Sequence, residues 1–169
     1  MNAMTSTHAA GVTIAALPLT TRIALRADPA AATGLGLPTT VGVRSAEGNR
    51  TALCLGPDEW LLEAPEAERE TLLAALAGVA APLSVVDVSD REITLALEGP
   101  AVLDLLATGC PRDLARMPTG SGARTVFDSA QVVLTRETDD RFHLTVWRSF
   151  APHVRAILDL AVRELAAGL

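Results

Sequence analysis

The stretch from Arg141 to Leu165, RFHLTVWRSFAPHVRAILDLAVREL, decides the fold. In its first part, Phe142, Leu144 and Val146 are separated by single residues, which is the two-residue period of a strand with one buried face. After Arg148 the period lengthens to that of an amphipathic helix. We expect the apolar stripe of this helix to consist of Phe150, Val154, Ile157, Leu158, Ala161 and Leu165. The chain therefore passes from a strand directly into a helix.

The bend between these two elements is predicted to be sharp. Ser149 is a candidate N-cap, because its hydroxyl can accept a hydrogen bond from an amide of the first helical turn. Pro152 fits the first turn, where backbone amides have no intrahelical partner to lose. The bend brings together an aromatic residue, Trp147, and a guanidinium, Arg148, while we expect Phe150 to pack into the domain's own core.

The rest of the chain contains strands and helices in mixed order. We expect strands at residues 19–26, from Val41, and at 51–55, 84–89, 91–97, 122–127 and 131–136, with helices from Pro65 and over 101–108. An apolar segment resumes at 60–62 after the Gly-Pro-Asp break. Residues 28–38 are rich in Ala, Gly and Pro and are predicted to form a loop. This order is typical of an α+β fold, with a mostly antiparallel sheet and flanking helices, rather than of a regular βαβ alternation.

The length of 169 residues suits one compact domain, or two small subdomains that share a core. We expect residues 1–15 to be a flexible N-terminal leader and residues 16–169 to form the single α+β domain. The first Arg is Arg22, so the start of the sequence lacks the basic region of a signal peptide. Apolar runs fall well short of the ~20 residues that span a bilayer. These features predict a cytoplasmic protein.

The charge composition argues against two classes of partner. The net charge is −6 at pH 7 and there is no basic run, whereas nucleic acids and anionic membranes are bound by clustered cations. All 14 basic residues are Arg. The absence of Lys excludes Schiff-base chemistry, a P-loop lysine and a lysine general base, and the absence of Tyr excludes a tyrosine acid.

The cysteines and histidines indicate neither a redox centre nor a zinc site. Cys54 and Cys110 lie far apart in apolar contexts, which favours buried structural thiols over a disulfide. The three His residues, at positions 8, 143 and 153, do not have the spacing of zinc ligands.

A polar cluster between two predicted strands is the first candidate for catalysis. It consists of Asp87, Ser89, Asp90 and Arg91, and catalytic groups often lie on such connections. Asp and Ser residues are equally typical of turns, so the turn interpretation is the simpler one.

The remaining candidates are single residues or pairs. Asp58 and Glu59 are adjacent on an extended segment, so their carboxylates point to opposite faces. His143 is interpreted as a residue on the sheet face, packed under a helix or a partner, and Ser149 lacks the Gly-x-Ser-x-Gly pattern of a nucleophile elbow. The sequence thus shows no assembled catalytic device, which favours a binding or scaffolding module over an enzyme.

Four motifs, taken together, resemble the gamma subunit of heterotetrameric sarcosine oxidase. They are Leu55–Leu62 (LGPDEWLL), Val86–Arg91 (VDVSDR), Gly99-Pro100 followed by Leu103–Leu106 and Gly109–Leu114 (GCPRDL), and Arg148–Ala151 (RSFA). Each motif is short, and their order and spacing make the resemblance specific. It extends from about residue 19 to about residue 166.

The resemblance implies a set of properties for the whole complex. The enzyme of this family oxidises sarcosine to glycine with oxygen, giving hydrogen peroxide and, with tetrahydrofolate, 5,10-methylenetetrahydrofolate. Alpha and beta subunits carry FAD, FMN, NAD and the folate site, and a delta subunit binds zinc. The gamma subunit is similar to the folate-binding domain of the glycine cleavage T-protein and is not credited with catalytic or cofactor-binding residues.

The resemblance also implies that this chain works by packing against the other subunits. Interfaces use aromatic and Arg anchors, which bury a large area or form forked hydrogen bonds. Our candidates for such anchors are Arg148, Trp147, Trp60 and Phe150, with Arg148 first because local packing explains it least. For Trp60 and Phe150 the alternative is that they fill the domain's own core.

Two other functions stay open at this point. The first is a free-standing folate-binding module of the T-protein type in one-carbon metabolism, of which 169 residues would supply one wall of the folate pocket. The second is a small thiol-dependent enzyme that uses Cys54 or Cys110, which requires an accessible thiolate.

Overall fold

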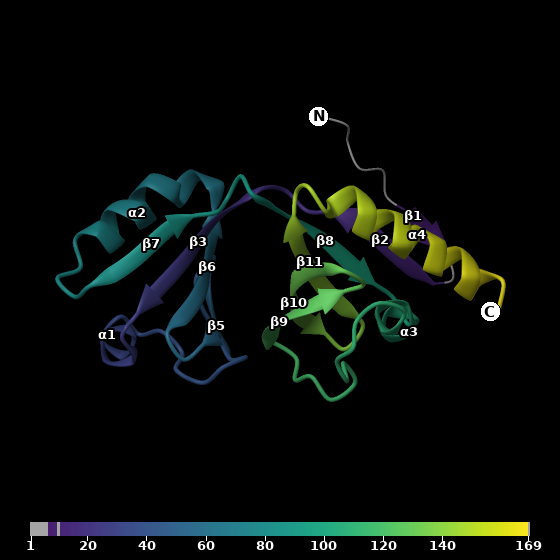
Figure 1. Cartoon of the computed structure of the whole chain (residues 1–169), viewed down its shortest axis with the longest axis horizontal. Helices are drawn as coiled ribbons and strands as arrows, with labels where there is room; N and C mark the ends of the chain where they lie inside the picture. Colours follow the sequence, from purple (N-terminus) through teal and green to yellow (C-terminus); the bar gives the residue numbers. More distant parts are fainter. Residues whose placement is uncertain (1–6, 10, 169) are drawn as a thin grey trace. The chain divides into compact units, whose positions relative to one another are not determined.

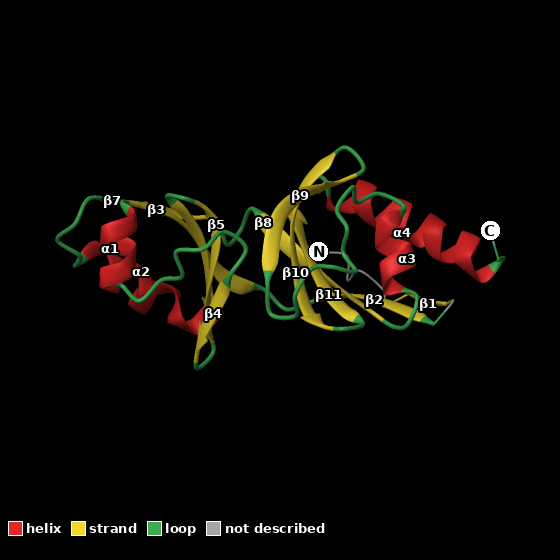
Figure 2. Ribbon diagram, turned by 90° about the horizontal axis from the view of Figure 1, so that it is seen from below, coloured by secondary structure: helices red, strands yellow, loops and turns green. Residues whose placement is uncertain are grey.

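The computed structural model describes residues 7–9 and 11–168, so residues 1–6, 10 and 169 lie outside the described residues. The chain forms two compact units, one made of Met1–Pro18 with Arg91–Leu169 and the other of Leu19–Asp90. Each unit is an antiparallel sheet with helices on one side (Figures 1 and 2). The predicted α+β class with antiparallel strands and flanking helices is confirmed. No described helix combines the length and the apolar character needed to cross a membrane.

The first unit contains a six-stranded sheet with strand order β1-β2-β8-β11-β10-β9. Its strands are β1 (Thr7–Ala9), β2 (Val12–Ala16), β8 (Glu92–Glu98), β9 (Gly122–Phe127), β10 (Ala130–Thr138) and β11 (Arg141–Trp147). Helices α3 (Val102–Ala107) and α4 (Ala151–Ala166) pack on one face of this sheet and share its hydrophobic core (Figure 2).

The second unit contains a five-stranded sheet with strand order β4-β5-β6-β3-β7. Its strands are β3 (Thr20–Ala27), β4 (Arg44–Glu47), β5 (Arg50–Gly56), β6 (Glu59–Pro65) and β7 (Leu83–Asp87). Helix α1 (Pro29–Gly34), the 3₁₀ helix η1 (Glu66–Glu68) and helix α2 (Arg69–Ala77) complete the unit. Its core includes Trp60 and Leu76.

Strand β11 has the role that its alternating pattern predicts. It lies between β8 and β10 in the sheet, and its Phe142, Leu144 and Val146 are buried. Helix α4 covers these side chains with Val154 and Leu158, which are fully buried. The apolar face of β11 and the apolar face of α4 pack against each other. This is why the strand pattern is followed directly by the helix pattern in this stretch.

The start of α4 differs from the prediction. The helix begins at Ala151, and the residue in the N-cap position is Phe150, without a side-chain capping bond, so the expected Ser149 cap is wrong. Phe150 is 43% exposed and does not join the core. The turn before the helix directs Ala151 inward instead, and the buried face then includes Val162, which the predicted stripe omitted.

Two other segments differ from expectation. Residues 7–9 and 12–15 of the expected flexible leader lie in β1 and β2, and Val12 and Ile14 are buried in the core. Residues 1–6 and 10 of that leader lie outside the described residues. The expected loop at 28–38 contains α1, because Asp28 accepts a hydrogen bond from the Ala30 amide at 2.8 Å and Pro29 occupies the first turn.

Candidate functional site

The bend between β11 and α4 is fixed by backbone hydrogen bonds. The antiparallel register of β8 and β11 places Trp147 opposite Glu92. The Arg148 amide then donates to the Arg91 carbonyl at 2.8 Å, and the Phe150 amide donates to the Trp147 carbonyl at 2.9 Å. We call Arg91, Trp147, Arg148 and Phe150 the aromatic corner.

The aromatic corner holds both exposed aromatic side chains of the protein. The sequence has two Trp, three Phe and no Tyr, and three of these five, Trp60, Phe127 and Phe142, are at most 1% exposed. Trp147 is 40% exposed and Phe150 is 43% exposed. Their ring centroids lie 6.4 Å apart with planes at 48°, within the range of a favourable aromatic pair.

Arg91 connects this ring pair to a buried carboxylate. Its guanidinium carbon lies 4.9 Å from the centroid of the Trp147 ring, which is a cation–π geometry. The same guanidinium donates to Glu92 Oε1 at 2.8 Å, and the Glu92 side chain is only 8% exposed. The sequence placed Arg91 in a turn cluster, and no pattern along the chain links it to Trp147, because strand pairing makes that contact.

Arg148 has a fixed backbone and a free side chain. Its amide is bound to Arg91, and its side chain is exposed. Within the part of the chain that the structure describes, its guanidinium has no hydrogen-bond or ion-pair partner. Local packing therefore does not account for this residue.

Trp60 does not belong to this surface. It lies on β6, is 1% exposed, and donates from Nε1 to the Pro38 carbonyl at 2.6 Å. A ring that is packed and hydrogen-bonded inside its unit cannot anchor a partner without unfolding that unit. Of the four predicted anchors, the structure thus brings together Trp147, Arg148 and Phe150 and removes Trp60.

Comparison with known proteins decides the family. The model of the sarcosine oxidase gamma subunit family matches residues 20–164. Sarcosine oxidase subunit gamma of Corynebacterium sp. (strain U-96) is 36% identical, over 98% of this chain and 87% of that protein. The subunit from an Arthrobacter species is 34% identical, over 94% of this chain and 84% of that protein. The chain belongs to the sarcosine oxidase gamma subunit family.

Solved structures agree with this family membership. A chain of the heterotetrameric sarcosine oxidase from Corynebacterium sp. U-96, in complex with pyrrole 2-carboxylate, matches with a TM-score of 0.81 and 33% identity, covering 95% of this chain and 88% of that chain. Aminomethyltransferase T of the glycine cleavage system from Bartonella henselae matches with a TM-score of 0.64 and 18% identity, covering 95% of this chain and 52% of that chain. The second match shows a shared fold, as the sequence resemblance implied.

Two glycines in the motifs that carry the family resemblance have steric roles. Gly99 has φ +138°, and a Cβ there would collide with the Gly11 carbonyl oxygen. A Cβ on Gly109 would lie 2.9 Å from the ring of Phe127. These motif positions therefore preserve close packing in the first unit.

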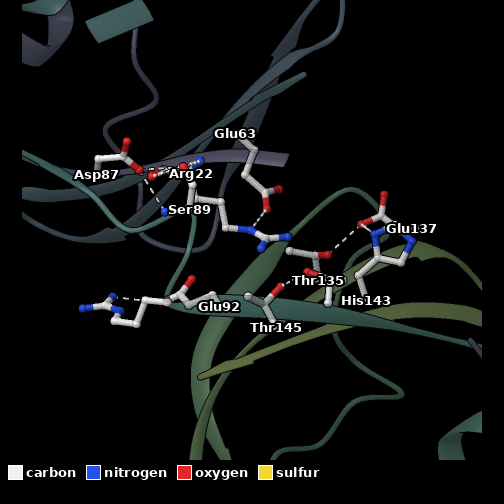
Figure 3. A network of polar contacts seen from close by, with 11 residues as sticks. Arg22, Glu63, Asp87, Ser89, Glu92, Thr135, Glu137, His143 and Thr145 are labelled. Carbon is white, nitrogen blue, oxygen red and sulfur yellow. Dashed lines mark hydrogen bonds and ion pairs between the residues drawn. The ribbon is translucent and has the colours of Figure 1, made fainter. Parts of the chain in front are cut away.

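The Asp87–Arg91 cluster forms a hydrogen-bonded turn. The Ser89 hydroxyl donates to Asp87 Oδ1 at 2.6 Å and accepts from the Arg22 amide at 2.9 Å (Figure 3). Asp87 also accepts from Arg69 Nε at 2.5 Å. Burial acts to raise the pKa of the Asp87 carboxyl, but the hydrogen bonds from Ser89 and Arg69 outweigh it and lower that pKa below its ordinary value of 3.8. These bonds join β3, β7 and α2 and support the turn interpretation.

In the same unit, Arg22 on β3 is 3% exposed and donates from Nε to Glu63 Oε1 on β6 at 2.7 Å (Figure 3). The two residues are opposite each other in the strand register. A buried guanidinium of this kind needs a carboxylate partner, and the pair fixes the register of β3 and β6.

In the first unit, His143 and two neighbours on β10 form a small polar group. His143 Nδ1 lies 3.4 Å from Glu137 Oε1, and Thr135 donates to the same oxygen at 2.6 Å (Figure 3). His143 is opposite Thr135 in the strand register, on the face away from Phe142 and Leu144. His143 lies on a sheet face as predicted, but on the face opposite the core that α3 and α4 cover, so it is not packed under these helices.

Ser129, His153 and Asp128 contain the residue types of a catalytic triad but not its geometry. His153 Nε2 lies 3.0 Å from Asp128 Oδ2 and 3.4 Å from the Ser129 hydroxyl. A triad binds the carboxylate and the nucleophile through different ring nitrogens, whereas both contacts here use Nε2. The hydrogen bond from His153 lowers the pKa of Asp128 and connects the β9–β10 turn to α4.

Metal and thiol chemistry have little support. No three His, Cys, Asp or Glu side chains of the described residues are grouped so that they could hold a metal ion. Both cysteines are buried, and burial raises the pKa of the Cys54 thiol, which opposes formation of a thiolate.

An open pocket of about 130 Å³ lies in the second unit beside Leu37, Arg50 and Glu63. Two charged groups in its lining are already paired, Arg50 with Glu68 and Glu63 with Arg22.

Proposed function

We propose that this chain is the gamma subunit of a heterotetrameric sarcosine oxidase and acts as a non-catalytic assembly subunit. The observation that carries the proposal is the nearly full-length match to a chain of the Corynebacterium heterotetramer, which covers 95% of this chain at a TM-score of 0.81. Because this chain shares sequence and fold with its relatives over this length, we expect it to bind equivalent partner subunits.

The catalytic activity belongs to the assembled complex and not to this chain alone. With alpha, beta and delta subunits, the assembled enzyme oxidises sarcosine to glycine, with formation of hydrogen peroxide and 5,10-methylenetetrahydrofolate. FAD, FMN, NAD, tetrahydrofolate and zinc are held by those other subunits. The cytoplasmic location predicted from the sequence stays a prediction.

The non-catalytic role is supported by the state of the polar groups. The Ser89 hydroxyl is bonded to Asp87 and to the Arg22 amide, and the Arg22 guanidinium is bonded to Glu63. Ser129, Asp128 and His153 lack the geometry for nucleophilic attack. Both exposed aromatic rings, Trp147 and Phe150, lie in the aromatic corner, which suits contact with protein. We therefore propose Trp147, Arg148 and Phe150 as the docking residues.

Co-expression with the alpha, beta and delta subunits tests the assignment. We expect this chain to co-elute with them in equal stoichiometry on size exclusion, with sarcosine-dependent production of hydrogen peroxide in that peak. Elution of this chain alone, while the other subunits assemble without it, would contradict the proposal. Calorimetry of the isolated chain with tetrahydrofolate tests the folate-binding alternative, which requires saturable binding; we expect no binding heat.

A further inference from the structure

We propose that the aromatic corner is the docking site for an acidic segment of a partner subunit. A carboxylate of that segment binds the guanidinium of Arg148, and an adjacent apolar side chain packs on Trp147 and Phe150. This inference rests on the proposed function and adds to it the chemistry of the partner surface.

The apolar half of the site follows from the distribution of aromatic side chains. Three of the five aromatic rings are buried, and the two exposed rings are neighbours at one bend. Exposed aromatic residues that cluster are typical of the anchors at the centre of protein interfaces. Covering Trp147 and Phe150 with an apolar side chain removes both rings from water in a single contact.

The charged half follows from the balance of local charges. Arg91 already shares the carboxylate of Glu92, whereas the guanidinium of Arg148 has no carboxylate among the described residues. The aromatic corner is therefore locally cationic on a chain whose net charge is −6. A guanidinium binds a carboxylate through two parallel hydrogen bonds, which a partner's Asp or Glu can supply.

The same charges argue against a second copy of this chain as the occupant. A two-fold contact through the aromatic corner would bring two copies of it into one interface, with two Arg148 guanidinium groups and no added carboxylate from either corner. The overall charge of −6 on each copy adds repulsion. A partner with complementary charge avoids both costs.

The backbone of the aromatic corner is already held in place before a partner binds. The amides of Arg148 and Phe150 are bonded within the bend, and Arg91 is held between the Trp147 ring and Glu92. Little conformational freedom remains for the backbone to lose on binding, and this favours affinity.

The complete absence of Lys allows a direct test. Arg148→Lys introduces the single side-chain amine of the chain, and a carbodiimide joins an amine to a carboxylate only where the two are in contact. In the complex assembled by co-expression, we expect this variant to form a covalent product with a partner subunit, mapped by mass spectrometry to a partner Asp or Glu. Arg163→Lys, at an exposed position of the adjoining helix α4, is the matched control and should form no cross-link through its introduced amine.

Charge reversal gives the second measurement. We expect Arg148→Glu to lower the amount of this chain retained by the other subunits by roughly tenfold, a change of about 1.4 kcal/mol, whereas Arg163→Glu retains it as the wild type does. Circular dichroism must show both variants folded. An intact Arg148→Lys complex without a partner cross-link, or full retention of Arg148→Glu, overturns the docking site while leaving the subunit assignment in place. Failure of the wild type to assemble overturns both.

Discussion

The guanidinium of Arg91 lies 4.9 Å from the ring centroid of Trp147, and the same group is bonded to the buried carboxylate of Glu92. The two residues are far apart in sequence and meet because β8 and β11 are paired, with Glu92 opposite Trp147. One face of the indole is thereby occupied by a cation, while the ring remains 40% exposed. The ring is thus oriented by its own chain and still open to a partner.

We expect Trp60 to be important for stability and Trp147 for retention by the other subunits. Trp60→Ala should lower the free energy of unfolding by about 3–5 kcal/mol, because it empties a fully buried site and leaves the Pro38 carbonyl without its donor. Trp147→Ala should change it by less than about 1 kcal/mol. Urea unfolding of the isolated chain measures both. Retention by the other subunits should fall for Trp147→Ala, and an unchanged retention would remove Trp147 from the docking residues.

Gly109→Ala is expected to destabilise the first unit by about 1–3 kcal/mol, because the added methyl group overlaps the ring of the fully buried Phe127. Gly34→Ala is the matched control: nothing lies within 4 Å of a Cβ at this helical position, and the change should be neutral or slightly stabilising. Thermal unfolding compares the two. Equal melting temperatures would show that Phe127 moves aside.

Arg136 is expected to be the principal support of the connection between α3 and β9. It is 9% exposed, lies over the Phe142 ring, and donates to the carbonyls of Leu114, Met117 and Asp139. Arg136→Met should cost about 2–3 kcal/mol, since buried carbonyls lose a charged donor. Hydrogen exchange should rise in residues 110–121. Arg163→Met, at an exposed position, provides the control, and equal exchange in both variants would contradict this role.

Asp87 is expected to make stability depend on acid pH. Its folded-state pKa is lowered below 3.8, so its contribution is complete above the unfolded-state value and is lost as the pH falls through the folded-state value. Asp87→Asn should therefore be less stable than the wild type near neutral pH, and the difference should shrink below about pH 4. Chemical unfolding across that range measures it. A difference that is the same at all pH values would mean that the carboxylate charge does not matter.

Much of the fold could be predicted from local patterns. The alternation of Phe142, Leu144 and Val146 predicted β11, and the spacing of Val154 and Leu158 predicted α4, because each pattern matches the period of its own element. Helix α1 was missed although Asp28 and Pro29 are ordinary start signals, because the Ala- and Gly-rich segment after them has no apolar stripe.

The candidate site could be predicted only in part. Trp147 and Arg148 at a bend were identified from the change of period, and the structure places both there, exposed. The exposure of Phe150, the burial of Trp60 and the contact of Arg91 with Trp147 could not be inferred. Each depends on segments distant in sequence that cover a side chain or leave it open.

The sequence by itself determined the α+β class, the strand-to-helix bend at Trp147–Phe150 and the resemblance to the gamma subunit family. All three depend on the periodicity of neighbouring residues or on the order and spacing of short motifs. Only the tertiary structure decided which aromatic rings remain in contact with water. Burial is set by long-range strand pairing and helix packing, which enclose Trp60 within the second unit and leave Trp147 and Phe150 adjacent on the surface of the first.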